Sequence, residues 1–387
     1  MNVLVIGKPK YNVYLQTEEY PKEGSIIKVP EKLEMTGGTS VYVACMLAKW
    51  GMQVSYAGAV SGDEIGNKIK AEIESYGVDI KHMETDFERK TNYNFIVLNK
   101  ANGSSTQIEH TNETALKKYR YEFIPDFIIT DGSDMGASMA AANNYPTAKI
   151  ITLANKLDVE YANLSKRSAY VCASLRFAAA LVKVPVDYRS KALVNLFQKV
   201  RDLNKAEFIM MMQEKGVLYR KERQVKMIPA IEVQKQDDGN SGSAFFAAYC
   251  YGIINGYDMD EVAKIANIAG ALSLTKVGTL SSIPTKEEVY KMSGLTEGEK
   301  KSETPAQPAP VQKTAEMPAP NVSQTAPTAE MPAPAAQGPA APTEMPAPST
   351  PEVVQTPNID AALQNIAGQP SEMPKPINNE GTTNETL

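Results

Sequence analysis

Residues 237–245 have the residue types and the spacing of an anion-binding site. A polar loop interrupted by glycines leads into an apolar helix, which we expect over residues 244–255. The first turn of a helix leaves backbone N–H groups without partners, and the positive end of the helix dipole points the same way. A phosphate could therefore bind at Asn240, Ser241 and Gly242.

The same loop also allows a purely structural interpretation. Serine is a favoured N-cap residue, so this stretch could simply begin a helix. Acid–base chemistry would need a carboxylate within hydrogen-bond reach of a ligand. Asp237 and Asp238 are the acidic residues of the stretch, and both precede its turn.

Alternating strands and helices are expected to position this loop. Short apolar runs predict buried strands at residues 1–7, 52–59, 127–130, 149–153, 169–172 and 208–212. A helix is predicted over residues 188–203, between the last two of these strands. This order predicts an α/β fold with a doubly wound, mostly parallel sheet and helices on both faces. Ligands bind such sheets at the carboxyl ends of the strands.

Two polar regions predict a smaller β-sheet lid. Residues 10–35 contain short extended patches between prolines, and residues 91–110 have the pattern of a hairpin. Between these regions, Gly37 and Gly38 precede a helix that we expect over residues 39–50. The two glycines either let a ligand approach the backbone closely or form a tight turn before the helix.

Composition argues against several classes of function. The 387 residues carry a formal net charge of −5 without a basic region, so we expect no nucleic-acid partner. No apolar run approaches the roughly 20 residues that span a bilayer, so we expect no membrane partner. Three isolated cysteines and two histidines predict core thiols in a cytoplasmic protein and no metal site.

The composition changes after about residue 292. Most of the 25 prolines lie beyond residue 300, in a segment rich in Ala, Thr and Gln. Residues 293–387 are therefore predicted to be disordered. The sequence Glu-Met-Pro-Ala-Pro recurs at residues 316–320, 330–334 and 344–348, with a divergent copy at 372–376. These repeats could bind a protein partner that recognises proline-rich segments, or could act only as a spacer.

Several motifs of residues 1–292 together resemble the ribokinase-like (PfkB) carbohydrate kinases. They are Gly37-Gly38, Leu47-Ala48-Lys49-Trp50-Gly51, the segment 57–66, Ser75-Tyr76-Gly77-Val78-Asp79, Glu214-Lys215-Gly216-Val217, the loop 237–245 and Ala266-Asn267-Ile268-Ala269-Gly270. The resemblance implies a ribokinase-like fold whose lid comes from residues near 10–35 and 91–110. It also implies ATP and Mg²⁺ as cofactors, a sugar or nucleoside as ligand, and a homodimer formed through the lid.

The resemblance also implies roles for single residues. It places the substrate at Asn12, Gly37, Gly38 and Tyr42, the phosphate at Asn240, Ser241 and Gly242, and the nucleotide at Gln213, Gly216 and Asn267. The position of the family's catalytic Asp is Ser243. A serine hydroxyl does not accept a proton near neutral pH without a base of its own.

Other signature positions depart from the family pattern as well. Asn12 replaces an Asp, Tyr42 an Asn, Asn240 a Gly, Ser174 and Phe177 an Asn and a Glu, and Met211 and Gln213 a Thr and a Gly. We therefore expect reduced or lost phosphoryl transfer, and a role as a binding or interaction module. The alternative is an active, divergent carbohydrate or nucleoside kinase that uses Asp237 or Asp238 as its base.

Overall fold

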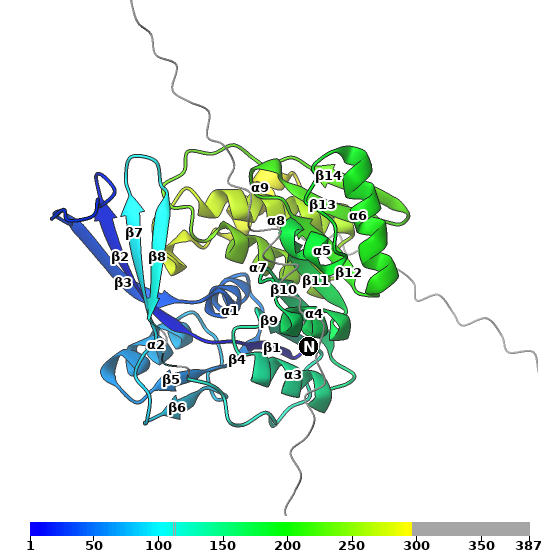
Figure 1. The fold of residues 1–387 in the computed structure, drawn as a ribbon. Coiled ribbons are helices and arrows are strands. Elements are labelled where there is room, and N and C mark those ends of the chain that lie inside the picture. The colour runs from blue at the N-terminus through cyan, green and yellow to red at the C-terminus, as the bar shows by residue number, and fades with distance from the viewer. Residues whose placement is uncertain (111, 113, 296–387) are drawn as a thin grey trace, which may run out of the picture. The chain divides into compact units, whose positions relative to one another are not determined.

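A computed structural model describes residues 1–295 of the chain, apart from residues 111 and 113 (Figure 1). These residues belong to a compact unit that extends from Met1 to Lys301. The proline-rich segment, with its expected disorder and its repeats, lies outside the described residues. Among the described residues, no helix is long and apolar enough to cross a membrane.

An eight-stranded sheet forms the centre of this unit, in the order β14-β13-β12-β11-β10-β9-β1-β4. Its strands are β1 (Val3–Ile6), β4 (Val54–Ala57), β9 (Phe127–Thr130), β10 (Lys149–Ala154), β11 (Tyr170–Ser174), β12 (Glu207–Met211), β13 (Val217–Lys221) and β14 (Gln224–Ile228). The six strands from β4 to β12 pair in parallel, which confirms the predicted α/β fold. Two strands that were not predicted from the sequence, β13 and β14, add an antiparallel edge.

Helices cover both faces of this sheet. They are α1 (Thr39–Lys49), α2 (Glu64–Ser75), α3 (Met135–Asn144), α4 (Val159–Arg167), α5 (Leu175–Leu181), α6 (Ser190–Leu203), α7 (Ser241–Ile254), α8 (Met259–Ser273) and α9 (Lys286–Ser293). Alternate residues of each strand face opposite sides. In β1, Val3 and Val5 pack in the core with α1, α7 and α8, whereas Leu4 and Ile6 pack with α3.

The lid is a four-stranded sheet that projects from the main body (Figure 1, blue and cyan strands). Its order is β3-β2-β7-β8, with β2 (Lys10–Thr17), β3 (Glu31–Gly37), β7 (Tyr93–Asn99) and β8 (Ser105–His110). The two predicted strand pairs are joined by parallel pairing of β2 with β7. A separate small sheet pairs β5 (Ala59–Ser61) with β6 (Glu84–Asp86).

Asp63 connects the base of the lid to the main body. Its carboxylate accepts hydrogen bonds from Gly66 N (2.8 Å), where it caps α2, and from Thr91 Oγ1 (2.7 Å), just before β7. Burial alone raises the pKa of Asp63, but the hydrogen bonds from Ser61, Thr91 and Gly66 outweigh it and lower the pKa to about 2. Asp63 is thus an ionised structural residue.

Candidate functional site

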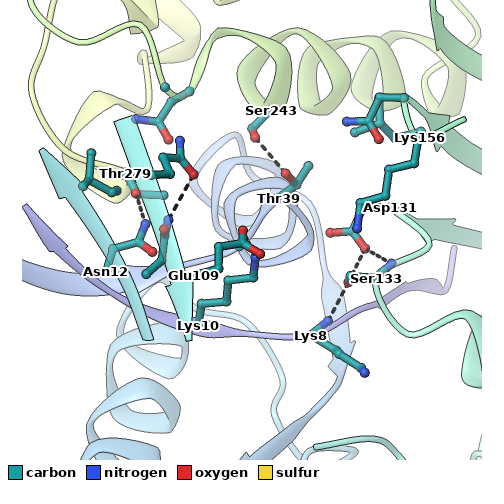
Figure 2. A pocket seen from close by; sticks show the side chains of 18 of the residues that line it. Lys8, Lys10, Asn12, Thr39, Glu109, Asp131, Ser133, Lys156, Ser243 and Thr279 are labelled. Carbon is teal, nitrogen blue, oxygen red and sulfur yellow. Dashed lines mark hydrogen bonds and ion pairs between the residues drawn. The ribbon is translucent and has the colours of Figure 1, made fainter. Parts of the chain in front are cut away.

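The larger of two neighbouring cavities lies between the lid and the main body, and its volume is about 240 Å³ (Figure 2). Residues of β2, β7 and β8 line it on the lid side. On the opposite side, Lys8, Asp131 and Lys156 follow the carboxyl ends of β1, β9 and β10. These three strands are neighbours in the sheet, as expected for a ligand site in this type of fold.

The lid presents one row of polar side chains to this cavity. Asn12 of β2 lies opposite Asn94 of β7, which in turn lies opposite Glu109 of β8. Asn12 Nδ2 donates to Thr279 Oγ1 at 2.6 Å, and Asn94 Nδ2 donates to Gln107 Oε1 at 3.1 Å. The Oδ1 atoms of both asparagines are buried and have no hydrogen-bond partner in the described part of the chain.

Gly37 and Gly38 serve two different purposes. A Cβ on Gly37 would lie 2.1 Å from Asn12 Nδ2, so only glycine leaves room for that side chain. Gly38 precedes α1 with φ of 106°, a conformation that favours glycine, and it lines the cavity. Gly38 thus forms a tight turn and also lies on the wall of the cavity.

Asp131 supplies the cap that Gly38 lacks. One of its carboxylate oxygens accepts a hydrogen bond from Ser40 N, in the first turn of α1, at 2.9 Å. The other accepts from Ser133 N at 2.9 Å and from Ser133 Oγ at 2.5 Å. This carboxylate is thus held by three donors from the protein itself.

The start of α7 lies at both cavities. Asn240 and Ser243 line the larger cavity, whereas Ser241 and Gly242 line the smaller one. Asn240 makes no side-chain cap. The N–H groups of residues 241–243 precede the first intrahelical bond, from Ala244 N to Asn240 O, and form no hydrogen bond with other described residues. This is the arrangement that an anion site requires.

Ser243 points toward the other helix that begins at the cavity. Its hydroxyl donates to Thr39 Oγ1 of α1 at 3.1 Å (Figure 2). The carboxylates that line the cavity, Glu109 and Asp131, come from other elements, and within the described residues neither is hydrogen-bonded to Ser243 or Thr39.

Neither aspartate of the loop lines the larger cavity. Asp237 is fully buried, and its carboxylate accepts from Gly239 N at 2.9 Å and from Gly278 N at 3.0 Å. Burial raises the pKa of Asp237 above its ordinary value. Asp238 is exposed and accepts a 2.7 Å hydrogen bond from Ser105 Oγ of the lid.

The implied substrate role of Tyr42 has no support in its position. Its side chain is 0% exposed within the core between α1 and α7, and it lines neither cavity. An aromatic side chain on the apolar face of α1 is a core residue here, and a ligand cannot reach it.

The smaller cavity brings together the residues that the resemblance assigned to a nucleotide. Gln213, Gly216 and Asn267 line it with the start of α7, and its volume is about 90 Å³. Gly216 has φ of 95°, and a Cβ there would lie 2.0 Å from Ile228 O, so this turn requires glycine. Asn267 Nδ2 donates to Pro229 O at 2.8 Å, which is a local structural bond.

Residues 1–286 match the family model of the pfkB family carbohydrate kinases. The chain belongs to this family. It is 21% identical to the ribokinase of Bacillus subtilis (strain 168) over 293 residues, which cover 75% of this chain and 99% of the relative.

Solved structures agree on the ribokinase-like fold of the pfkB domain. The ribokinase of Thermotoga maritima has a TM-score of 0.63 and 20% identity, covering 76% of this chain and 99% of that one. The Arabidopsis thaliana ribokinase, solved with ribose and ATP, also has a TM-score of 0.63, at 16% identity and with the same coverage.

Two further signature positions of the pfkB domain have structural roles. Ser174 caps α5 by accepting a 3.1 Å hydrogen bond from Phe177 N. The Phe177 side chain is buried in the core with α5 and α6. Within the described residues, no group of three or more His, Cys, Asp or Glu side chains could hold a metal ion.

Several residues of the larger cavity were not predicted from the sequence. They are Lys8, Asn94, Glu109, Asp131, Lys156 and Thr279. A usable signal existed for Lys8, Asp131 and Lys156, because each follows a predicted parallel strand, where ligands bind. The lid residues had no such signal, because the register between β2, β7 and β8 decides which of their side chains face the cavity.

Proposed function

We propose that the pfkB domain of this chain binds a sugar or nucleoside in the larger cavity, beside a nucleotide, with reduced or lost phosphoryl transfer. It would then act as a binding or interaction module. The observation that carries this proposal is the hydroxyl of Ser243, hydrogen-bonded to Thr39, at the position where the family pattern has a carboxylate.

The rest of the site supports ligand binding more than catalysis. The free N–H groups of residues 241–243 suit a phosphate of ATP, and the turn at Gly216 lines the same smaller cavity as Ser241 and Gly242. A positioned base typically contributes about 10²–10⁴-fold to a rate, and the hydroxyl pair cannot replace it. The N–H groups alone would still stabilise a bound phosphate electrostatically.

The alternative is an active, divergent kinase with Asp237 or Asp238 as the base. Asp237 would have to leave two backbone donors unpaired to reach a substrate. Asp238 would have to release Ser105 and turn from the lid toward the cavity. The alternative therefore needs a rearrangement of the loop on ligand binding.

Activity assays with the full chain test this proposal. Purified protein, ATP and Mg²⁺ are incubated with a panel of sugars and nucleosides, and ADP formation is measured. We expect turnover near the background rate, together with measurable ATP or ADP binding by calorimetry. Robust turnover that Asp238→Asn abolishes would instead establish the alternative.

We also propose two interactions with other protein molecules. The proline-rich segment would tether a protein partner, and the lid would form a homodimer. Deleting residues 296–387 should remove the partner from a pull-down while the protein still binds nucleotide. An unchanged pull-down would exclude the first of these roles, and a monomer in light scattering would exclude the second.

A further inference from the structure

The larger cavity carries an excess of positive charge. Three lysines and two carboxylates line it, namely Lys8, Lys10, Lys156, Glu109 and Asp131. Glu109 forms an ion pair with Lys10, and Asp131 is satisfied by three protein donors. Lys10 thus neutralises Glu109, whereas Asp131 keeps its negative charge among neutral donors, and one positive charge remains in excess.

The other two lysines form no ion pair with these carboxylates. Neither Lys8 Nζ nor Lys156 Nζ has a hydrogen bond or ion pair with another residue in the described part of the chain. Figure 2 shows the Lys156 side chain extending from the loop after β10 toward Asp131 and the cavity. An ammonium group in this position is a ready partner for a carboxylate or a phosphate.

The opposite wall of the cavity carries polar amide side chains. Asn12, Asn94 and Gln107 line it from the lid, and Asn12 and Asn94 are 4% and 5% exposed. An amide group can both donate and accept hydrogen bonds, as hydroxyl groups of a ligand do. The two walls therefore suit different groups of one ligand, an acidic group at the lysines and hydroxyl groups at the asparagines.

We propose that the larger cavity selects a polyhydroxylated ligand that carries an acidic group, either a carboxylate or a phosphate. Its hydroxyls lie against the polar row of the lid, at Asn12 and Asn94. Its acidic group lies at Lys156, with Lys8 as a second cation. A volume of about 240 Å³ suits one compact monosaccharide. This inference rests on the proposed use of the cavity as a ligand site, but not on whether phosphoryl transfer is lost.

Calorimetry with three matched probes tests the inference. The full chain is titrated with ribose, ribonate and ribose 5-phosphate, without nucleotide. We expect at least one acidic probe to bind about tenfold more tightly than ribose, the equivalent of one charge-assisted hydrogen bond. The two acidic probes distinguish a carboxylate from a phosphate.

Two variants test the contributions of the two walls of the cavity separately. Lys156→Met should remove the preference for the acidic probe over ribose, whereas Asn94→Ala should weaken every probe that binds by a similar factor. Lys199→Met, an exposed lysine on α6, is the matched control and should change nothing.

Different outcomes would overturn the selectivity for acidic ligands and the loss of phosphoryl transfer. Equal affinity for the three probes, no binding of any probe, or a preference that survives Lys156→Met would overturn this inference. Rapid ATP-dependent turnover of the acidic probe would instead overturn the loss of phosphoryl transfer, while the selectivity for acidic ligands would stand.

Discussion

Ser243 Oγ lies 3.1 Å from Thr39 Oγ1, and this hydrogen bond joins the first turn of α7 to the first residue of α1. The two helices begin at the same wall of the larger cavity. A reacting hydroxyl of a ligand in this cavity would therefore meet another hydroxyl where a base is needed. Whether this site can accept a proton from a ligand therefore depends on the side chain at position 243.

Ser243→Asp should restore a base at this position. If the rest of the site binds ATP and a substrate, the rate should rise by up to about 10²–10⁴-fold, the usual contribution of a positioned base. Thr39 can donate a hydrogen bond to the new carboxylate and orient it. The measurement is ADP release with a ligand that calorimetry has shown to bind. Ser243→Asn, which adds similar bulk without a charge, is the control, and equal rates for both variants would contradict the prediction.

Asp237 should make a pH-dependent contribution to stability. Because burial raises its pKa in the folded state above the ordinary value of 3.8, its contribution is complete below that pH and is lost as the pH rises through the folded-state pKa. Asp237→Asn cannot titrate, and its amide leaves one of the two backbone donors without an acceptor. We expect it to cost about 1–3 kcal/mol of the free energy of unfolding.

The measurement is urea unfolding of the native protein and of Asp237→Asn over a pH series that begins below 3.8. The difference between the two free energies of unfolding should narrow as the pH rises. A difference that stays constant over the series would show that Asp237 has the same pKa in both states. Asp238→Asn, at the exposed neighbour, is the matched control.

Gly242→Ala should raise the stability of the protein and weaken its binding of ATP. A Cβ at Gly242 would meet no heavy atom within 4 Å, and the backbone there is helical, so the substitution is sterically allowed. Alanine at a compatible position typically stabilises by about 0.4–1 kcal/mol. The new methyl group would lie in the smaller cavity, which Gly242 lines. We expect a higher Tm together with weaker ATP binding in calorimetry; unchanged ATP affinity would place the nucleotide elsewhere.

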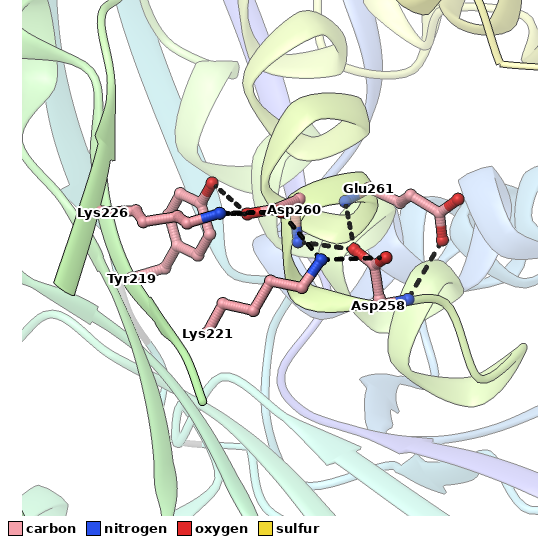
Figure 3. A network of polar contacts seen from close by, with 6 residues as sticks. All are labelled: Tyr219, Lys221, Lys226, Asp258, Asp260 and Glu261. Atoms are coloured by element: carbon pink, nitrogen blue, oxygen red, sulfur yellow. Dashed lines mark hydrogen bonds and ion pairs between the residues drawn. The ribbon is translucent and has the colours of Figure 1, made fainter. Parts of the chain in front are cut away.

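A network of charges fixes the antiparallel edge of the sheet to α8 (Figure 3). Asp260 accepts hydrogen bonds from Tyr219 Oη (2.7 Å), Lys221 Nζ (2.8 Å) and Lys226 Nζ (2.9 Å). Burial alone would raise the pKa of Asp260, but these three partners outweigh it and lower the pKa. The network holds β13 and β14, next to the turn that carries Gly216.

Asp260→Asn should lower the free energy of unfolding by about 1 kcal/mol, since partly exposed ion pairs contribute little individually. The loss should shrink at 1 M salt, where screening weakens the native pairs. Urea unfolding at low and high salt measures both effects. Glu160→Gln, an exposed first-turn acid on α4, is the control. An equal loss at both salt concentrations would assign the effect to packing or to the Tyr219 hydrogen bond.

Local patterns of the sequence determined most of the fold. The apolar runs at residues 127–130 and 149–153 correspond to β9 and β10, because a strand buried on both faces must be continuously apolar. The glycine loop before residue 244 led into α7, with free N–H groups at its start as expected. The departure at Ser243 was also visible, since Gly242 and Phe245 anchor its position in the family pattern.

Tertiary structure alone decided what surrounds that loop. Asp237 is buried and Tyr42 is in the core, because burial depends on which elements pack together and not on residue type alone. β13 and β14 were missed because their polar and charged residues are satisfied by α8, an element distant in sequence. Likewise, only the register of β2, β7 and β8 brings Asn12, Asn94 and Glu109 into one row facing Lys156 across the cavity. Such alignments arise from pairing between distant segments, which no local pattern encodes.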